Sequence, residues 1–531
     1  MGAEHRNRKA SARTISYVTV LSIALGVTVI AAPCRQPVSA MQTAVAGHRV
    51  DLDTTLSVRE VIEENGSTKH DRTLETLRIR AAAVLTDWLR FDSTTIGTNG
   101  GPTMKADRSG VYNLDDAFQD VSPAAEFDEA YFDIGLPSVD VRLGKQKFAW
   151  GKLDRSQPND LINPRSYIDP LLQDEAEQKI GVPALEGTYY LPDAAWLPQE
   201  SRLTAVWVPK YVPFRFPLAT CDLQGSTSRC DVERWFPPAA LPPTSIAVPL
   251  PHSSSSLNVP LTFRTSNTLP GFSLANSAIA LRYAATVRDT DVALYYYRGI
   301  DTDPAFLLSA DAVGEPDPTS PIGVKPGVYG ATVLTPEFHQ IDSWGADFAT
   351  ALDRFSVRGE GAFVRGRPFP RDLRGLISNP STLTAQLPGI LRALAAGAGQ
   401  VPVDLPPSAV VRDAIEWGLG SDYTYAGYML LLQVNQTDVL HNSVQLLIKD
   451  VETRLLANIR KSFFADRVQL QLVTVHAIES DYTFVRPRLT YRLTDNIAAQ
   501  VGYLFIAGRA ESIGGQYRRN GEGWMRLEYT L

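Results

Sequence analysis

The chain has 531 residues, of which 44% are hydrophobic and 21% are charged, and its formal net charge is −7. This acidic balance argues against a general nucleic-acid-binding protein, because such proteins carry strongly basic surfaces. Beyond residue 32 no apolar stretch approaches the roughly 20 residues that a membrane helix needs, which excludes a helical membrane protein.

The N-terminal 40 residues have the pattern of a secretory signal peptide. Basic residues at positions 6, 8, 9 and 13 precede an apolar run over residues 15–32, and Val38-Ser39-Ala40 then offers small residues for cleavage. The pattern predicts that residues 1–40 are removed and that the mature chain is 41–531. The alternative is a single membrane anchor, because about 18 apolar residues is near the lower limit for spanning a membrane.

Apolar and polar residues alternate over segments of about ten residues along the mature chain. Residues 279–287, 468–472, 499–507 and 525–531 show a period of two, which gives a β-strand one apolar face and one polar face. We therefore predict an all-β fold, a transmembrane antiparallel β-barrel of about 18 strands, with 16 as the alternative count. Residues 48–93 fit either one long hairpin or three strands.

Short and long connections separate these segments. Tight polar turns at 288–291, 352–354, 465–467 and 494–496 are assigned to the periplasmic side, where barrels keep their connections short. Residues 94–125, 151–183, 212–276, 300–337 and 367–411 are predicted as long extracellular loops or loops folded into the pore mouth. We expect 212–276 and 367–411 to narrow the mouth, and Leu383–Ala398 to form a short helix within a loop.

Two cysteines remain after the predicted cleavage removes Cys34. Cys221 and Cys230 lie in one polar stretch, and an even cysteine count in an exported protein favours a disulfide. A zinc site is the weaker interpretation, because no histidine lies nearby to complete its ligands.

The segment after the first tight turn carries the most specific motif. Gly144-Lys145-Gln146 is followed by Trp150-Gly151 and then by Asp160 and Asn163-Pro164-Arg165. This pattern resembles an uncharacterised family of proteobacterial outer-membrane proteins, and more distantly the alginate-export and phosphate-selective porins. The resemblance covers residues 126–190 and implies an outer-membrane channel without indicating its solute. The residue types themselves favour structural roles, in a close strand approach and in turns.

Arginines on several predicted strands point into the lumen if the apolar rows face lipid. An arginine on the lipid face at mid-membrane would cost about 2–4 kcal/mol, which supports this orientation. The predicted pore-lining residues are Arg78, Arg80, Arg142, Arg282, Arg358, Arg454, Arg460, Arg486, Arg488, Arg492 and Arg526. In one interpretation they attract anionic solutes, and in the other they pair with inward carboxylates such as Asp140, Glu360 and Glu528. Both can hold, because paired charges still set an electric field across the pore.

No sequence motif points to catalysis, a metal or a cofactor. The histidines lack the spacing of metal ligands, and no nucleophile elbow or phosphate-binding glycine loop occurs. Asp154 and Asp160 fit turns better than a calcium site. We therefore predict a non-enzymatic protein without cofactor or metal, although a barrel-borne Ser/His pair would need no local motif.

Together these patterns predict a porin-like channel of the bacterial outer membrane for passive diffusion of small polar or anionic solutes. The alternative is an outer-membrane transporter of hydrophobic compounds, with an apolar entry at Leu250 to Phe272, and a third class is a structural or secretion-linked barrel. The expected partners are outer-membrane lipid, lipopolysaccharide, the barrel assembly machinery and a small-molecule solute. The residues mark neither the solute, the pore radius nor an oligomer interface.

Overall fold

The protein is described by a computed structural model. It describes residues 41–531 except 46–47, 66–67, 100–123, 168–174, 217–218, 225–226, 233–234, 239–244, 250–255, 267–269, 303–304, 321, 326 and 373–380. The predicted signal peptide, residues 1–40, lies outside the described residues.

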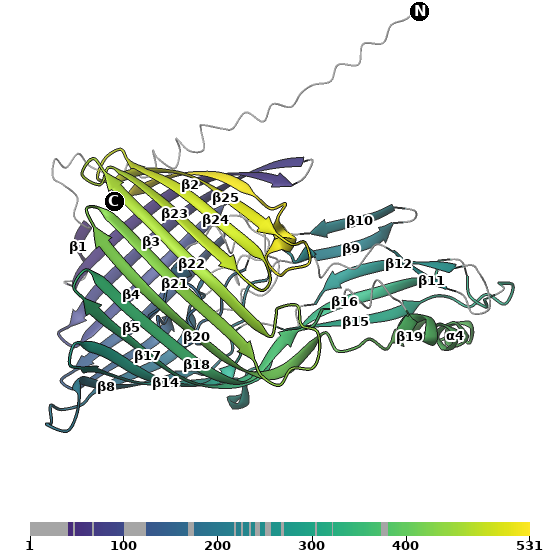
Figure 1. The fold of residues 1–531 in the computed structure, drawn as a ribbon, viewed down its shortest axis with the longest axis horizontal. Helices are drawn as coiled ribbons and strands as arrows, with labels where there is room; N and C mark the ends of the chain where they lie inside the picture. Colours follow the sequence, from purple (N-terminus) through teal and green to yellow (C-terminus); the bar gives the residue numbers. More distant parts are fainter. Residues whose placement is uncertain are drawn as a thin grey trace, which may run out of the picture.

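An 18-stranded antiparallel β-barrel forms the body of the molecule, which confirms the predicted fold class (Figure 1). Each strand pairs with the next one around the wall, and the last strand pairs with the first, at Thr55↔Thr530 through Glu63↔Glu522, so the sheet is closed. The strands are β2 (His48–Asn65), β3 (Thr68–Thr86), β4 (Leu89–Asn99), β5 (Ala124–Leu136), β6 (Val139–Gln146), β7 (Val182–Tyr190), β8 (Gln199–Val208), β13 (Ala278–Val287), β14 (Thr290–Ile300), β17 (Gln340–Leu352), β18 (Phe355–Pro370), β20 (Ala409–Tyr425), β21 (Tyr428–Val439), β22 (Val451–Phe463), β23 (Val468–Ala477), β24 (Tyr482–Arg492), β25 (Ile497–Gly508) and β26 (Glu522–Thr530).

The structure decides how many strands residues 48–93 form. Residues 48–93 lie on three strands, β2, β3 and β4, rather than on one long hairpin. A further short strand, β1 (Met41–Val45), pairs with the beginning of β2.

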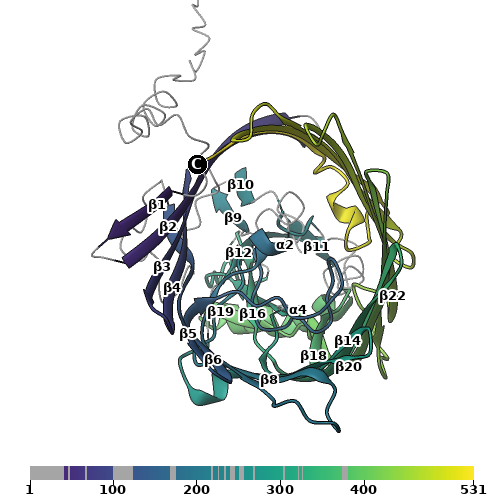
Figure 2. The same cartoon turned by 90° about the vertical axis from the view of Figure 1, so that its left-hand side faces the viewer.

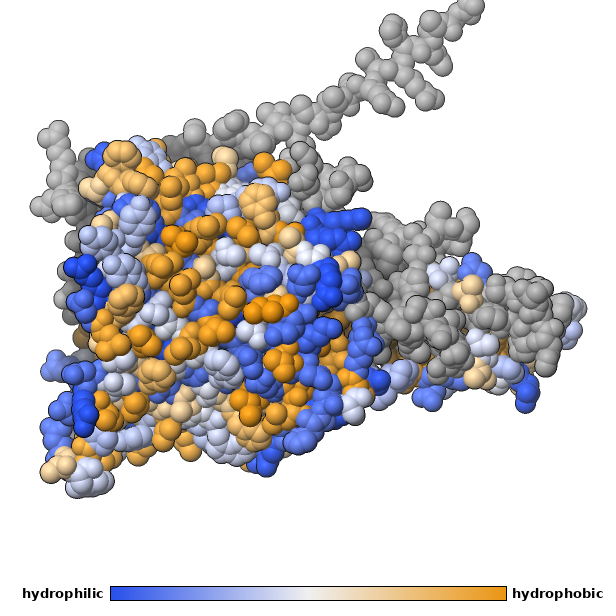
Figure 3. Space-filling view, viewed as in Figure 1, coloured by the Kyte–Doolittle hydropathy of each residue, from blue (hydrophilic) through white to orange (hydrophobic). Residues whose placement is uncertain are grey.

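Exposed apolar side chains form the outer face of the barrel. On β26, Met525, Leu527 and Tyr529 are exposed, whereas Trp524 is buried. Figure 3 shows apolar side chains running in diagonal rows across the wall, with hydrophilic ones gathered toward its ends. This alternation is that of a barrel whose outer surface lies in lipid.

Tight turns join the strands at the barrel end that carries the C-terminus (Figure 1). The predicted turns at 288–291, 352–354, 465–467 and 494–496 all connect neighbouring barrel strands. Asp353 has a φ of 56° and Gly427, in the β20–β21 turn, has a φ of 76°. Such positive φ values match a two-residue hairpin to the twist of its strands, and aspartate and glycine tolerate them.

A second sheet extends from the opposite end of the barrel, where the sequence predicted only loops (Figure 1). It has seven strands: β9 (Ala219–Gln224), β10 (Thr227–Val232), β11 (Ser245–Pro249), β12 (Ser256–Thr265), β15 (Ala305–Val313), β16 (Tyr329–Glu337) and β19 (Gln400–Val403). Helix α4 (Ser381–Ala395) packs Ile390 and Leu394 against Ala312, Val324 and Val328, and it is the helix predicted near 383–398.

The two cysteines lie opposite each other in the second sheet. Cys221 on β9 is the register partner of Cys230 on β10. Directly opposite residues of antiparallel strands have Cα atoms about 4.5–5.5 Å apart, within the range that a disulfide spans. The structure does not describe the side chains of these two cysteines, so the disulfide stays a prediction, which this register supports.

Candidate functional site

The connection between β6 and β7 folds into the barrel. We call residues 147–167 and 175–181, which include the short helix α2 (Glu175–Gln178), the inward segment. Figure 2 looks into the barrel and shows α2 inside the ring of strands. Phe148, Trp150 and Leu161 are buried in one hydrophobic cluster with Tyr295 and Val364 of the wall. We expected 212–276 and 367–411 to narrow the mouth. These connections contribute strands to the second sheet, and Arg215 of the 212–276 connection also lines the cleft described below, so their narrowing of the mouth stays a prediction.

Glu360 on β18 is the main anchor of the inward segment. Its carboxylate is buried and accepts hydrogen bonds from the backbone N–H of Lys152 at 2.6 Å, of Leu153 at 3.2 Å and of Asn159 at 3.3 Å. One carboxylate thus satisfies three backbone donors that would otherwise lack partners away from the strands.

Polar side chains of neighbouring strands extend this anchor. Arg358 on β18 donates to the carbonyl of Lys152 at 3.0 Å and pairs with Asp154 at 2.8 Å. Gln433 on β21 accepts from the N–H of Asp154 at 3.0 Å and donates to its carbonyl at 2.6 Å. Asn435 donates to the carbonyl of Ser156 at 2.9 Å. These contacts hold residues 152–156 flat against the inner wall.

Glycines in the wall make room for the segment. A Cβ atom on Gly345 of β17 would collide with the side chain of Asn159. One on Gly418 of β20 would lie 2.5 Å from the side chain of Leu153. The inner wall is therefore hollowed where the segment passes.

The motif residues at 160–165 stabilise the return of the segment to β7. Asn163 accepts from the N–H of Phe148 at 2.7 Å and donates to the carbonyls of Gln146 and Ile180. Asp160 is buried and pairs with Lys179 at 2.7 Å and with Arg165 at 3.3 Å. These contacts are structural, as the residue types indicated.

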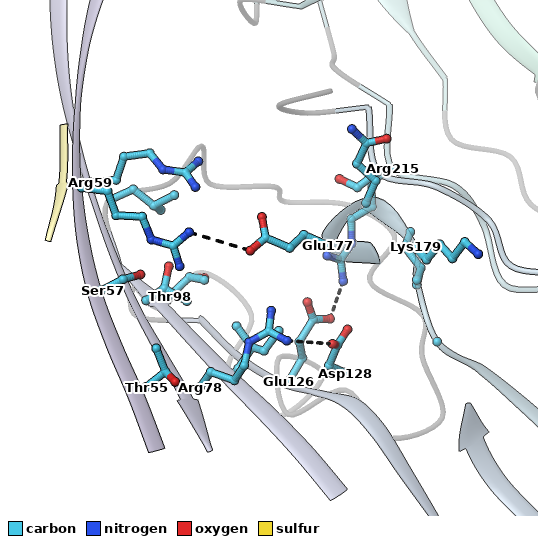
Figure 4. Close-up of a pocket in the computed structure, with 18 of the residues that line it drawn as sticks. Thr55, Ser57, Arg59, Arg78, Thr98, Glu126, Asp128, Glu177, Lys179 and Arg215 are labelled. Atoms are coloured by element: carbon cyan, nitrogen blue, oxygen red, sulfur yellow. Dashed lines mark hydrogen bonds and ion pairs between the residues drawn. The ribbon is translucent and has the colours of Figure 1, made fainter. Parts of the chain in front are cut away.

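A cleft of about 170 Å³ remains between the inward segment and the opposite wall (Figure 4). The wall side is formed by β2 to β6 and β26, and the other side by Ser166 and residues 177–181 together with Arg215.

Basic side chains outnumber acidic ones in the cleft. The basic residues are Arg59, Arg78, Lys145, Lys179, Arg215 and Arg526, and the acidic residues are Glu126, Asp128 and Glu177.

Ion pairs occur both between the two sides of the cleft and within its wall. Arg526 of the wall lies 3.9 Å from Glu177 of α2, Arg78 lies 4.0 Å from Asp128, and Arg215 pairs with Glu126. In Figure 4 the labelled side chains of Arg78 and Glu177 reach toward the gap from opposite sides. Fixed guanidinium groups of this kind can donate hydrogen bonds to the oxygens of a carboxylate or a phosphate.

Some of the predicted pore-lining arginines alternate with exposed apolar residues, as expected of inward-facing positions. Arg78 and Arg80 alternate with exposed Leu77 and Ile79, for example. Only Arg78 and Arg526 of the predicted set line the cleft. That the others line the pore stays a prediction.

Several of these arginines already have protein partners. Arg142 pairs with Asp133 at 3.2 Å, Arg358 binds the inward segment, and Arg282 lies 5.5 Å from the ring centre of Tyr295. Arg486 is buried. Such pairing is what the second interpretation of the arginines expects.

Four basic residues of the cleft were not among the predicted ones. Lys145 follows a glycine with a φ of 142°, where the strand alternation breaks, and Lys179 and Arg215 lie in connections without periodicity. Arg59 alternates on β2 as Arg78 does on β3, so the same alternation could have indicated it. The signals near this site are that alternation and the motif around Gly144.

Within the described ranges, no group of three or more His, Cys, Asp or Glu residues is placed to hold a metal ion. In the same part of the chain, no helix combines the length and apolar character required to cross a membrane.

Comparison with known proteins gives similarity at the level of solved structures. No protein-family model matches the sequence, and no curated protein matches it. OmpF of Salmonella typhi in complex with daunomycin is 10% identical, with 92% of this chain and 100% of that chain covered and a TM-score of 0.37. OccAB2 of Acinetobacter baumannii is 7% identical, with coverages of 91% and 98% and a TM-score of 0.43.

A third structure, OccK2 of Pseudomonas aeruginosa in complex with glucuronate, is 7% identical, with coverages of 91% and 98% and a TM-score of 0.42. These structures are outer-membrane porins. Identities and TM-scores this low carry no information about the solute of this chain. The similarity to alginate-export and phosphate-selective porins stays a prediction.

Proposed function

We propose that the protein is a porin-like channel of the bacterial outer membrane that lets small polar solutes, and anionic ones preferentially, diffuse passively through its barrel. The closed barrel with an apolar outer face supports the membrane location. The observation that carries the transport proposal is the cleft between the inward segment and the wall, in which six basic side chains outnumber three acidic ones.

The charges of the cleft explain the preference for anions. Inside a narrow pore the local dielectric is low, so a surplus of fixed positive charge raises the local concentration of anions. The carboxylates of Glu126, Asp128 and Glu177 offset part of this charge and set a field across the passage. The expected selectivity is therefore modest.

Planar bilayers test this function. With a salt gradient across the membrane, the reversal potential of the wild-type channel should indicate anion preference, and Arg78→Gln should reduce it because one fixed charge leaves the cleft. Arg354→Gln is the matched control, since Arg354 lies in the β17–β18 turn, outside the cleft. Clear cation selectivity of the wild type, or an equal effect of the two variants, contradicts the proposal.

The alternative is transport of hydrophobic compounds through the region Leu250 to Phe272. Phe272 is 74% exposed and Leu274 is 78% exposed, both in the connection that precedes β13, while residues 250–255 and 267–269 lie outside the described residues. Liposome swelling with sugars and organic anions separates the two functions, because a hydrophobic carrier would show no uptake. Binding to the barrel assembly machinery stays a prediction.

A further inference from the structure

The outer face of the barrel carries a row of charges directly beside a row of aromatic rings, near the end that bears the second sheet. Across three neighbouring strands, Arg298 on β14 is the register partner of Asp342 on β17, which is the register partner of Arg365 on β18. The next row toward the barrel centre, on the same face, pairs Tyr296, Trp344 and Phe363 in the same way. Aromatic rings mark the interface between hydrocarbon and head groups, so the charges lie at head-group level.

One carboxylate holds both arginines in place. Asp342 pairs with Arg365 at 2.6 Å and lies 3.7 Å from Arg298. The hydroxyl of Tyr296 donates to the same carboxylate at 3.0 Å, and the guanidinium of Arg365 lies 5.6 Å from the ring centre of Trp344. Contacts within the protein therefore hold the two guanidinium groups side by side.

The two arginines remain open toward the outside. Their side chains are 59% and 58% exposed, whereas that of Asp342 is 14% exposed. Each guanidinium has five N–H donors, which one shared carboxylate cannot occupy, and these three residues together carry one net positive charge. A second carboxylate, that of Asp413 on the adjacent strand β20, accepts a hydrogen bond from the N–H of Gly366. On a lipid-facing surface, the group that meets these donors belongs to a lipid.

We propose that Arg298 and Arg365 bind a phosphate group of lipopolysaccharide, the phosphorylated glycolipid of the outer leaflet. Guanidinium groups match phosphate oxygens in geometry and charge, and the aromatic row beside them contacts the acyl chains. The choice of the outer leaflet follows from the position of the row at the barrel end away from the tight turns. The inference rests on the proposed membrane location but not on conduction.

Binding of purified lipid A to the full-length mature barrel in detergent tests the site. Titration followed by native mass spectrometry should show that the double variant Arg298→Gln/Arg365→Gln binds bisphosphorylated lipid A about tenfold more weakly than the wild type, because two charge-assisted contacts are lost. Lipid A from which the phosphates have been removed should bind the wild type as weakly as the double variant binds the intact lipid. The two single variants should each lose part of the affinity, which keeps the test valid if the double variant misfolds.

A matched control lies at the other end of the barrel. Arg354 has its guanidinium 5.0 Å from the ring centre of Tyr425, a geometry like that of Arg365 over Trp344. Arg354→Gln should leave lipid A binding unchanged. Unchanged binding in the double variant, equal binding of dephosphorylated lipid A, or equal affinity for phosphatidylglycerol would overturn the assignment. Bilayer conductance is measured separately, so a failed lipid site and a failed channel are distinguishable.

Discussion

At the scale of single residues, glycines decide where the inward segment can lie. Gly345 faces the interior, where the side chain of Asn159 occupies the space next to its Cα atom. Gly361, on the adjacent strand β18, meets only ordinary contacts of 3.5 Å and 3.6 Å at the position of a Cβ. The same substitution should therefore have different effects at the two sites.

Gly345→Ala should destabilise the barrel by about 1–3 kcal/mol, because the added methyl group overpacks the contact with Asn159. Gly361→Ala should change the free energy of unfolding by a few tenths of a kcal/mol at most, within the range of a neutral surface change. Urea unfolding of both variants in detergent measures the difference. Equal midpoints for the two variants would show that the segment does not press against Gly345.

At the scale of elements, the inward segment depends on a few side chains of the opposite wall. Glu360 alone accepts three of its backbone hydrogen bonds. Without this carboxylate, the N–H groups of Lys152, Leu153 and Asn159 lose their partner, at a cost of about 1–3 kcal/mol for each one that stays buried. The segment avoids this cost if it detaches from the wall, because its N–H groups then bond to water.

Glu360→Ala should therefore expose the segment to protease. Mass mapping after limited trypsin treatment should find cleavage after Lys152 and Arg155, where the wild type resists. Glu186→Ala serves as the control, because Glu186 also faces the interior but pairs at 3.9 Å with Arg142 of the wall and not with the segment. Resistance of Glu360→Ala equal to that of the control would refute the anchoring role.

At the scale of the whole molecule, the barrel is closed by β26, which pairs with both β25 and β2. Deletion of residues 522–531 removes the partner of two strands and leaves two long unpaired edges in lipid, where an unsatisfied backbone group costs several kcal/mol. The truncated chain should lose the compact form that migrates differently on unheated gels. Deletion of residues 41–45 should preserve it, because β1 pairs only with the beginning of β2. A compact form in both deletions would contradict closure through β26.

The sequence predicted the barrel better than its contents. Alternation is visible within single segments such as 525–531, so counting these segments predicts a barrel and its approximate strand number. The second sheet could not be predicted in this way, because its strands come from separate connections, and β12 and β16 even pair in parallel across 63 intervening residues of chain. The cleft depends on the same kind of distant contact: Lys179 pairs with Asp160, and the N–H of Arg215 donates to the carbonyl of Arg165. Such contacts have no local periodicity to reveal them.

Arg59 and Arg526, which line the cleft, stand on the two strands that close the cylinder, and they are register partners. The join and the proposed conduit thus share one wall. During biogenesis the pairing that completes the sheet would also create the route for solutes, so a partly assembled chain would have no finished passage of its own. Defects in the pairing of the first strand with the last should consequently alter permeability, even when most of the cylinder is intact.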